Sequence, residues 1–258
     1  MSDVEVKDPG AAASVGQGLS EWQRVSNTFS APSKTFEDIK RGNRSWWLPF
    51  VIMVLSFAVF FAAVSTKVTW KSVAENNLKL APEFAKRMME RMTPEQRAKQ
   101  EERAPITEEI KAALSPFGVL LLDVIAAGVL LATINFGFGG KATFGSLFTV
   151  TLYAGLASWP LRWLLGAIVL FSGEDPEQFN INNFAPTNIG AFFPQQSIGL
   201  GLYSFLSGLD ALAIWCMVLT SIGVAIVAGV KRSSGYMAVF GWWVIGLLIF
   251  TGLGAAFS

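Results

Sequence analysis

Five long apolar runs, separated by shorter polar stretches, determine the environment in which this chain folds. The runs cover residues 46–66, 114–136, 144–171, 198–230 and 236–257 and carry almost no charge. Each is at least as long as the roughly 20 helical residues that cross the hydrocarbon core of a bilayer. The runs lack the alternation of apolar and polar residues that is typical of a transmembrane β-strand, so helices are predicted.

The runs therefore predict an all-α integral membrane protein built as a five-helix transmembrane bundle. The fourth run is too long for one straight crossing. It either breaks at Ser207-Gly208, which leaves Asp210 near the outer surface and a span over 207–230, or starts at Ile198, which leaves Asp210 deep. The domain organisation is an N-terminal segment (1–45), first disordered and then amphipathic, and a membrane domain (46–258).

Basic residues beside the runs predict the orientation. They lie before the first run, after the second and after the fourth: Lys34, Lys40, Arg41, Arg44, Lys141, Lys231 and Arg232. Because Lys and Arg accumulate on the cytoplasmic side, the N-terminus is expected in the cytoplasm and the C-terminus outside. Four tryptophans near the expected boundaries are candidate membrane-interface anchors: Trp22, Trp46, Trp47 and Trp70.

The polar segment 67–113, between the first two runs, is predicted to form an extramembrane helical hairpin. An apolar stripe at helical spacing marks its first helix: Phe84, Met88, Met89 and Met92. Thr93 to Gln96 has the pattern of a second helix start, and Pro105 is expected to end that helix. The stripe either docks on the protein itself or is a candidate partner surface, since methionine adapts to several surfaces.

The amphipathic part of the N-terminal segment is predicted to start at a capping box formed by Ser20 and Gln23. Leu19, Trp22 and Val25 recur every three residues in the same stretch, and Pro32 breaks the chain. Two placements remain open: a helix in the cytoplasmic headgroup layer, or a helix packed under the bundle.

Three charged residues fall inside the apolar runs: Asp123, Arg162 and Asp210. A charge at the bilayer centre costs at least about 2.5–3.5 kcal/mol, so it usually faces a partner or a cavity. We expect Arg162 to pair with Asp123, with Asp210 as a second partner, and Pro160 to kink the third span beside them. The cluster is either a structural clamp or part of a polar cavity or ion path.

The polar loop over 172–197 is rich in acids and amides. Its four phenylalanines predict that it folds back onto the bundle: Phe179, Phe184, Phe192 and Phe193.

The amino-acid composition argues against most kinds of catalytic and metal-binding site. The 258 residues include no histidine and one cysteine, Cys216, which lies in an apolar run. Without histidine, His-based metal, haem and general-base sites are excluded, and we expect no cofactor, no metal and no enzymatic activity. A net charge of +1 offers no basic field for nucleic acid.

Several short strings resemble a known family. They are PSKTFEDI (32–39), SWWLPF (45–50), MTPEQR (92–97) and LDALAIW (209–215). With five spans and a cytoplasmic N-terminus, the chain resembles a bacterial member of the Yip-one domain family, the Ypt/Rab-interacting membrane proteins. The Asp-Leu-Tyr-Gly-Pro string typical of the eukaryotic relatives is absent, which argues against a Rab-type GTPase as partner.

The resemblance implies a non-enzymatic, multi-pass protein of the bacterial inner membrane that acts as a scaffold, an adaptor or a membrane organiser. Its expected partners are the lipid bilayer and either another membrane protein or a second copy of itself. The alternative is a small transporter or channel that uses Asp123, Arg162 and Asp210.

Overall fold

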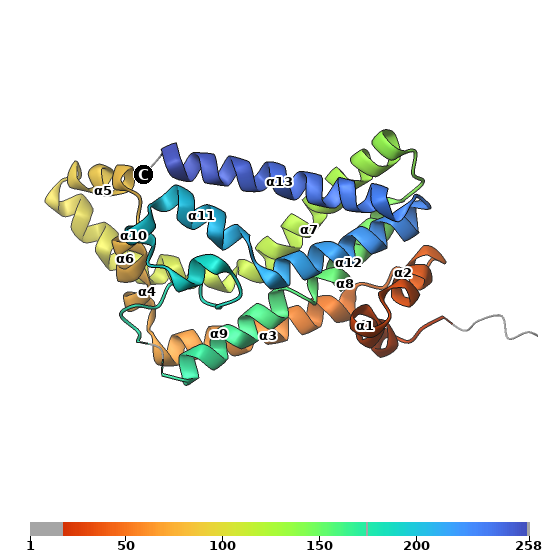
Figure 1. The fold of residues 1–258 in the computed structure, drawn as a ribbon. Coiled ribbons are helices and arrows are strands. Elements are labelled where there is room, and N and C mark those ends of the chain that lie inside the picture. The colour runs from red at the N-terminus through yellow and green to blue at the C-terminus, as the bar shows by residue number, and fades with distance from the viewer. Residues whose placement is uncertain (1–17, 174, 257–258) are drawn as a thin grey trace, which may run out of the picture.

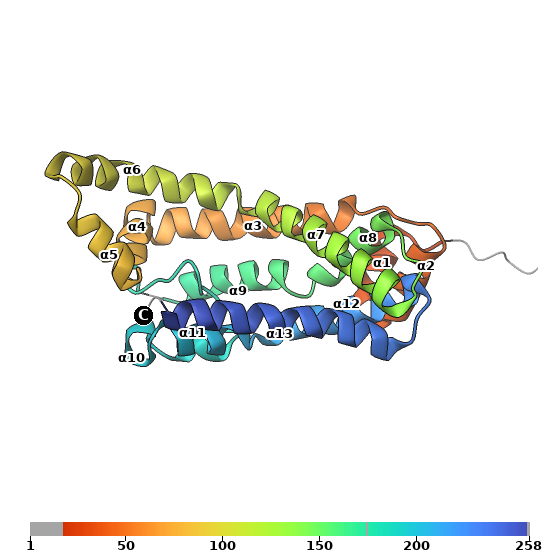
Figure 2. The same ribbon diagram turned by 90° about the horizontal axis from the view of Figure 1, so that it is seen from above.

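The computed structural model describes residues 18–173 and 175–256. Five of its helical segments are long and apolar enough to cross a membrane, and they lie side by side in one elongated bundle (Figures 1 and 2). Within these described ranges no β-strand is formed. The predicted all-α, five-span architecture is therefore confirmed. The disorder predicted for the start of the chain falls on residues 1–17, outside the described residues.

The spans are built from eight helical pieces. They are α3 (Trp47–Lys67), α7 (Ser115–Ala132) with its π-helical end η1 (Thr133–Gly137), α8 (Phe144–Gly155) with α9 (Trp159–Phe171), α11 (Leu200–Gly208) with α12 (Ala211–Ala228), and α13 (Arg232–Ala256). Helix α9 packs along α3, α7 packs on α8, and α12 lies between α8 and α13.

The third span is interrupted as predicted. Helix α8 ends at Gly155, and α9 begins at Trp159 with Pro160 in its first turn. Proline is tolerated there because the first helical N–H groups have no partner within the helix.

The fourth run breaks between Gly208 and Ala211, close to the predicted Ser207-Gly208. The shallow position expected for Asp210 after such a break is wrong. Helix α11 continues along α13, with Gly201 against Ala255 and Gly208 against Leu247. Leu247 lies nine residues before the end of α13, or about 13 Å at 1.5 Å per residue. Asp210 is therefore well inside the bundle.

The N-terminal segment forms α1 (Glu21–Ser30) and α2 (Pro32–Lys40), and the predicted capping box of Ser20 and Gln23 is present. Phe36 and Ile39 of α2 are fully buried in the core that α8 and α12 share. Of the two placements left open, packing under the bundle is therefore the one the structure adopts. Helices α1 and α2 lie at the opposite end of the bundle from the C-terminal end of α13 (Figure 1).

The polar segment after α3 contains α4 (Trp70–Lys79), α5 (Glu83–Glu90) and α6 (Pro94–Ala113). The start of α6 at Thr93, with its capping box to Gln96, is confirmed. The expected end at Pro105 is wrong, because α6 continues through it to Ala113. A proline inside a helix removes one hydrogen bond, and in a helix without buried residues water can satisfy the freed carbonyl.

Candidate functional site

The structure brings two of the three charges within the spans together. Arg162 of α9 and Asp210, the N-cap of α12, lie with guanidinium Nη1 and carboxylate Oδ2 3.7 Å apart. Asp210 is buried and already accepts two hydrogen bonds, from the Ala213 N–H at 2.8 Å and from the Thr187 hydroxyl at 2.5 Å. Its capping role explains why an aspartate stands at this break in the fourth run.

Asp123 is not part of that pair. It lies near Thr151 on α8, whose hydroxyl donates to the Phe148 carbonyl at 2.9 Å. Among the described residues, no ion pair joins it to Arg162. The expected Asp123–Arg162 pair is therefore not formed. The reason is the packing: α7 lies on α8, whereas α9, beyond the break, lies along α3.

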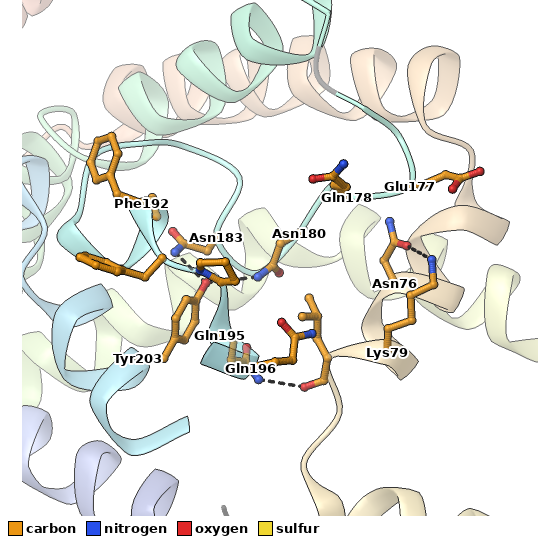
Figure 3. A pocket seen from close by; sticks show the side chains of 15 residues that line it. Asn76, Lys79, Glu177, Gln178, Asn180, Asn183, Phe192, Gln195, Gln196 and Tyr203 are labelled. Carbon is orange, nitrogen blue, oxygen red and sulfur yellow. Dashed lines mark hydrogen bonds between the residues drawn. The ribbon is translucent and has the colours of Figure 1, made fainter. Parts of the chain in front are cut away.

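Beside Arg162 lies a polar cavity, here called the outer cavity. It consists of two adjoining hollows of about 480 and 470 Å³, which share five lining residues: Leu80, Asn180, Asn183, Gln195 and Tyr203. Arg162 and Ser207 line the second hollow. Figure 3 shows how amide side chains of the loop and of α4 surround the first.

The loop between α9 and α11 builds one wall of this cavity. Phe179 is buried, and Phe184 packs at a tilt on Phe60 of α3 with ring centroids 4.3 Å apart. The prediction that the loop folds back onto the bundle is confirmed for these two rings. It is wrong for Phe192 and Phe193, which are exposed.

Hydrogen bonds hold the loop and α4 in place. The Asn76 side chain donates to the carbonyl oxygens of Pro176 (2.9 Å) and Phe179 (3.1 Å), and Gln195 donates to the carbonyl of Leu80 (2.9 Å). Asn180 and Asn183 donate to the Tyr203 hydroxyl at 3.3 and 2.9 Å. The amino-acid sequence carries one signal for these residues, the amide-rich stretch 180–183.

A separate groove lies outside the bundle, between α4, α5 and α6. This hairpin groove has a volume of about 730 Å³, and its apolar lining includes Leu78, Ala85, Met88, Met89 and Met92. Three of the four residues predicted as a partner surface therefore line it. The fourth, Phe84, is 47% exposed and lies beside it on α5.

Three of the four predicted tryptophan anchors lie at the ends of α3. Trp46 and Trp47 are exposed at its start. Trp70, beyond its other end, packs at a tilt on Phe61 with ring centroids 5.0 Å apart and donates to the Ser65 hydroxyl at 3.1 Å. Trp22 is 68% exposed on α1. Their anchoring role stays a prediction.

These features define a multi-pass helical membrane protein with a helical N-terminal module at one end and a hairpin and polar cavity at the other. The Yip1 domain model matches residues 26–253, and the chain belongs to the Yip1 domain family. No significant match was found among curated proteins or among solved structures. The predicted family is thus confirmed, and membership supports a membrane-associated role without a known enzymatic activity.

Proposed function

We propose that this protein is a membrane scaffold or adaptor that holds another membrane protein in the hairpin groove. One observation carries the proposal. Helices α5 and α6 contain no buried residue, although α5 carries a methionine stripe and Met88 is 60% exposed. An apolar stripe at helical spacing normally faces a core. Here it lines an open groove, which suits a helix that enters from a second protein.

The charges around the groove indicate the chemistry of that helix. The groove is lined by three carboxylates, Glu75, Glu101 and Glu108, and by one lysine, Lys71. An acidic rim around methionine side chains favours an amphipathic helix with an apolar face and flanking Lys or Arg residues. The hairpin adjoins the ends of α3 and α7, so the partner helix is expected next to the membrane.

The change Met88→Glu is expected to reduce capture of this partner at least about tenfold, because it places a charge in the apolar floor beside three carboxylates. The measurement is photocrosslinking in native membranes from a reactive residue at Gln100 on the groove wall, followed by identification of the crosslinked peptide. The captured segment should be an amphipathic helix with basic flanks.

The matched control is Ala98→Glu, which adds the same charge at an exposed position of α6 that does not line the groove. An equal loss in both variants, or adducts with lipid alone, would contradict the adaptor role. Adducts with a second copy of this chain would show that the groove binds another copy of the same protein and not a different protein.

The second candidate is a small transporter or channel using Asp123, Arg162 and Asp210. We place it second because only Arg162 and Asp210 meet, while Asp123 lies apart. The scaffold proposal predicts no ion flux through liposomes that contain the wild-type protein. Flux that Arg162→Ala abolishes, in a variant that remains folded, would favour the transporter instead.

For location we propose the bacterial inner membrane, with α1 and α2 in the cytoplasm and the hairpin outside. The basic residues that motivated this orientation come together at one end of the bundle. Arg232 donates to Ser33 at 3.0 Å, the Lys141 N–H donates to the Ala228 carbonyl at 3.0 Å, and Arg44 lies against Gly145. Such a concentration favours the cytoplasmic side.

A further inference from the structure

We propose that the outer cavity binds a phosphate group, held by Arg162 and Tyr203, and that this group belongs to a phospholipid headgroup or to a free phosphate ion. The proposal goes beyond the scaffold role and rests on different residues. The outer cavity contains hydrogen-bond donors for which the described part of the protein provides no acceptor.

Arg162 carries five N–H donors on a guanidinium group whose side chain is only 18% exposed. Among the described residues, no group accepts a hydrogen bond from it, and its Nε is fully buried without a partner. Asp210 is 3.7 Å away, beyond hydrogen-bond distance, and both of its oxygens accept bonds from Thr187 and Ala213. The two terminal nitrogens are not buried in this way, and a charged donor without an acceptor is costly, so an acceptor for them is expected in the cavity.

One further donor faces the same space, on α11. The Tyr203 hydroxyl accepts from Asn180 and Asn183, which leaves its own proton free to donate. The hydroxyl oxygen of Ser207, on the same helix, is fully buried against Gly190 and has no surface open to the cavity. Tyr203 lies on α11 and, with Arg162, lines the second hollow. The cavity therefore offers donors from two elements to one ligand.

The charge of the second hollow indicates an anion. Of the described residues that line it, Arg162 alone carries a formal charge, and the rest are amides, hydroxyls and apolar groups. Arginine matches phosphate well because its planar fork can donate two parallel hydrogen bonds to phosphate oxygens. The volume of about 470 Å³ lies within the range usual for small-molecule sites.

The cavity extends along α9 into the bundle. Arg162 lies nine residues before the end of α9 at Phe171, or about 13 Å along the helix. The irregular loop beside it is compatible with membrane depth, because non-helical backbone is tolerated where it lines a water-filled cavity. Phe192 lines the adjoining hollow and is 71% exposed, which offers apolar surface to an acyl chain.

The test uses the full-length protein in detergent and three probes: dihexanoyl phosphatidylglycerol, dihexanoylglycerol, which lacks the phosphate, and inorganic phosphate. Binding is measured by native mass spectrometry and by the shift in melting temperature. We expect binding of a phosphate-bearing probe only, weakened about tenfold or more by Arg162→Gln. Tyr203→Phe should weaken it several-fold, because it removes the second donor of the hollow.

The control Arg103→Gln, on the exposed face of α6, should leave affinity unchanged. Binding of the phospholipid alone would identify a headgroup, and competition by inorganic phosphate would identify the free ion. Equal binding of dihexanoylglycerol, or unchanged affinity in both Arg162→Gln and Tyr203→Phe, would overturn the proposal. If Arg162→Gln does not fold, the affinity of Tyr203→Phe decides the question.

Discussion

Replacing Arg24 with methionine is expected to lower the free energy of unfolding by about 3–5 kcal/mol, the usual cost of removing one partner from a buried ion pair. Arg24 is 1% exposed and lies where α1 meets the bundle. Its guanidinium group pairs with Glu21 and lies 3.8 Å from the buried carboxylate of Asp38.

Backbone and aromatic contacts add to this network. Arg24 donates to the carbonyl oxygens of Asn43 at 3.3 Å and Ser45 at 3.2 Å, and it lies 5.3 Å from the centroid of the Tyr153 ring. Tyr153 in turn donates to Glu21 at 3.1 Å. One side chain thus joins α1, the segment before α3, and α8. Methionine keeps much of the volume but leaves Asp38 without its buried cation.

The measurement is thermal or denaturant unfolding in a fixed detergent. Arg41→Met is the matched control, because Arg41 also approaches Asp38, at 3.9 Å, but is 64% exposed. An exposed pair of this kind is worth at most about 1 kcal/mol. Adding Asp38→Asn to Arg24→Met should recover part of the loss. Similar small effects of Arg24→Met and Arg41→Met would show that the network does not stabilise the fold.

A single methyl group at Gly235 is expected to destabilise the protein by about 1–3 kcal/mol, the usual cost of overpacking a close contact. Gly235 lies near the start of α13, where that helix crosses α12. A Cβ atom there would be 2.3 Å from the carbonyl oxygen of Ser221, which belongs to the backbone of α12 and cannot rotate away. The two helices would have to separate.

Gly241→Ala provides a control with the opposite expected sign. It lies on the same helix, but a Cβ atom at Gly241 meets nothing within 4 Å. Alanine should therefore stabilise the helix there by about 0.5–1 kcal/mol, the ordinary difference from glycine. Melting temperatures of both variants, measured in the same detergent, test the pair. A gain in stability from Gly235→Ala would mean that α12 and α13 are not in close contact.

Local patterns predicted local structure well. The capping boxes at Ser20 and Thr93 are both present, because each involves groups only three residues apart. The interruption beside Pro160 follows from the missing N–H and the ring of proline. The same rule placed the end of α6 wrongly at Pro105, since water around an exposed helix offsets the lost hydrogen bond.

The partner of Arg162 could not be chosen from the sequence. Depth along a helix follows from counting residues, and by that measure Asp123 and Asp210 were both reachable. Which one meets Arg162 depends on how the helices are arranged around the bundle and on α11 continuing past Asp210 along α13. Neither is encoded in a short pattern.

The amino-acid sequence by itself determined that this protein folds in a lipid bilayer and how many times it crosses the bilayer. Both follow from the length of each apolar run and from its lack of charge, which can be counted directly along the chain. Only the tertiary structure decided where α1 and α2 pack, how the loop after α9 closes over Arg162, and which donors face the outer cavity. Those outcomes depend on contacts such as Asn76 with Phe179, which lie about a hundred residues apart. Such contacts form only when separate helices dock.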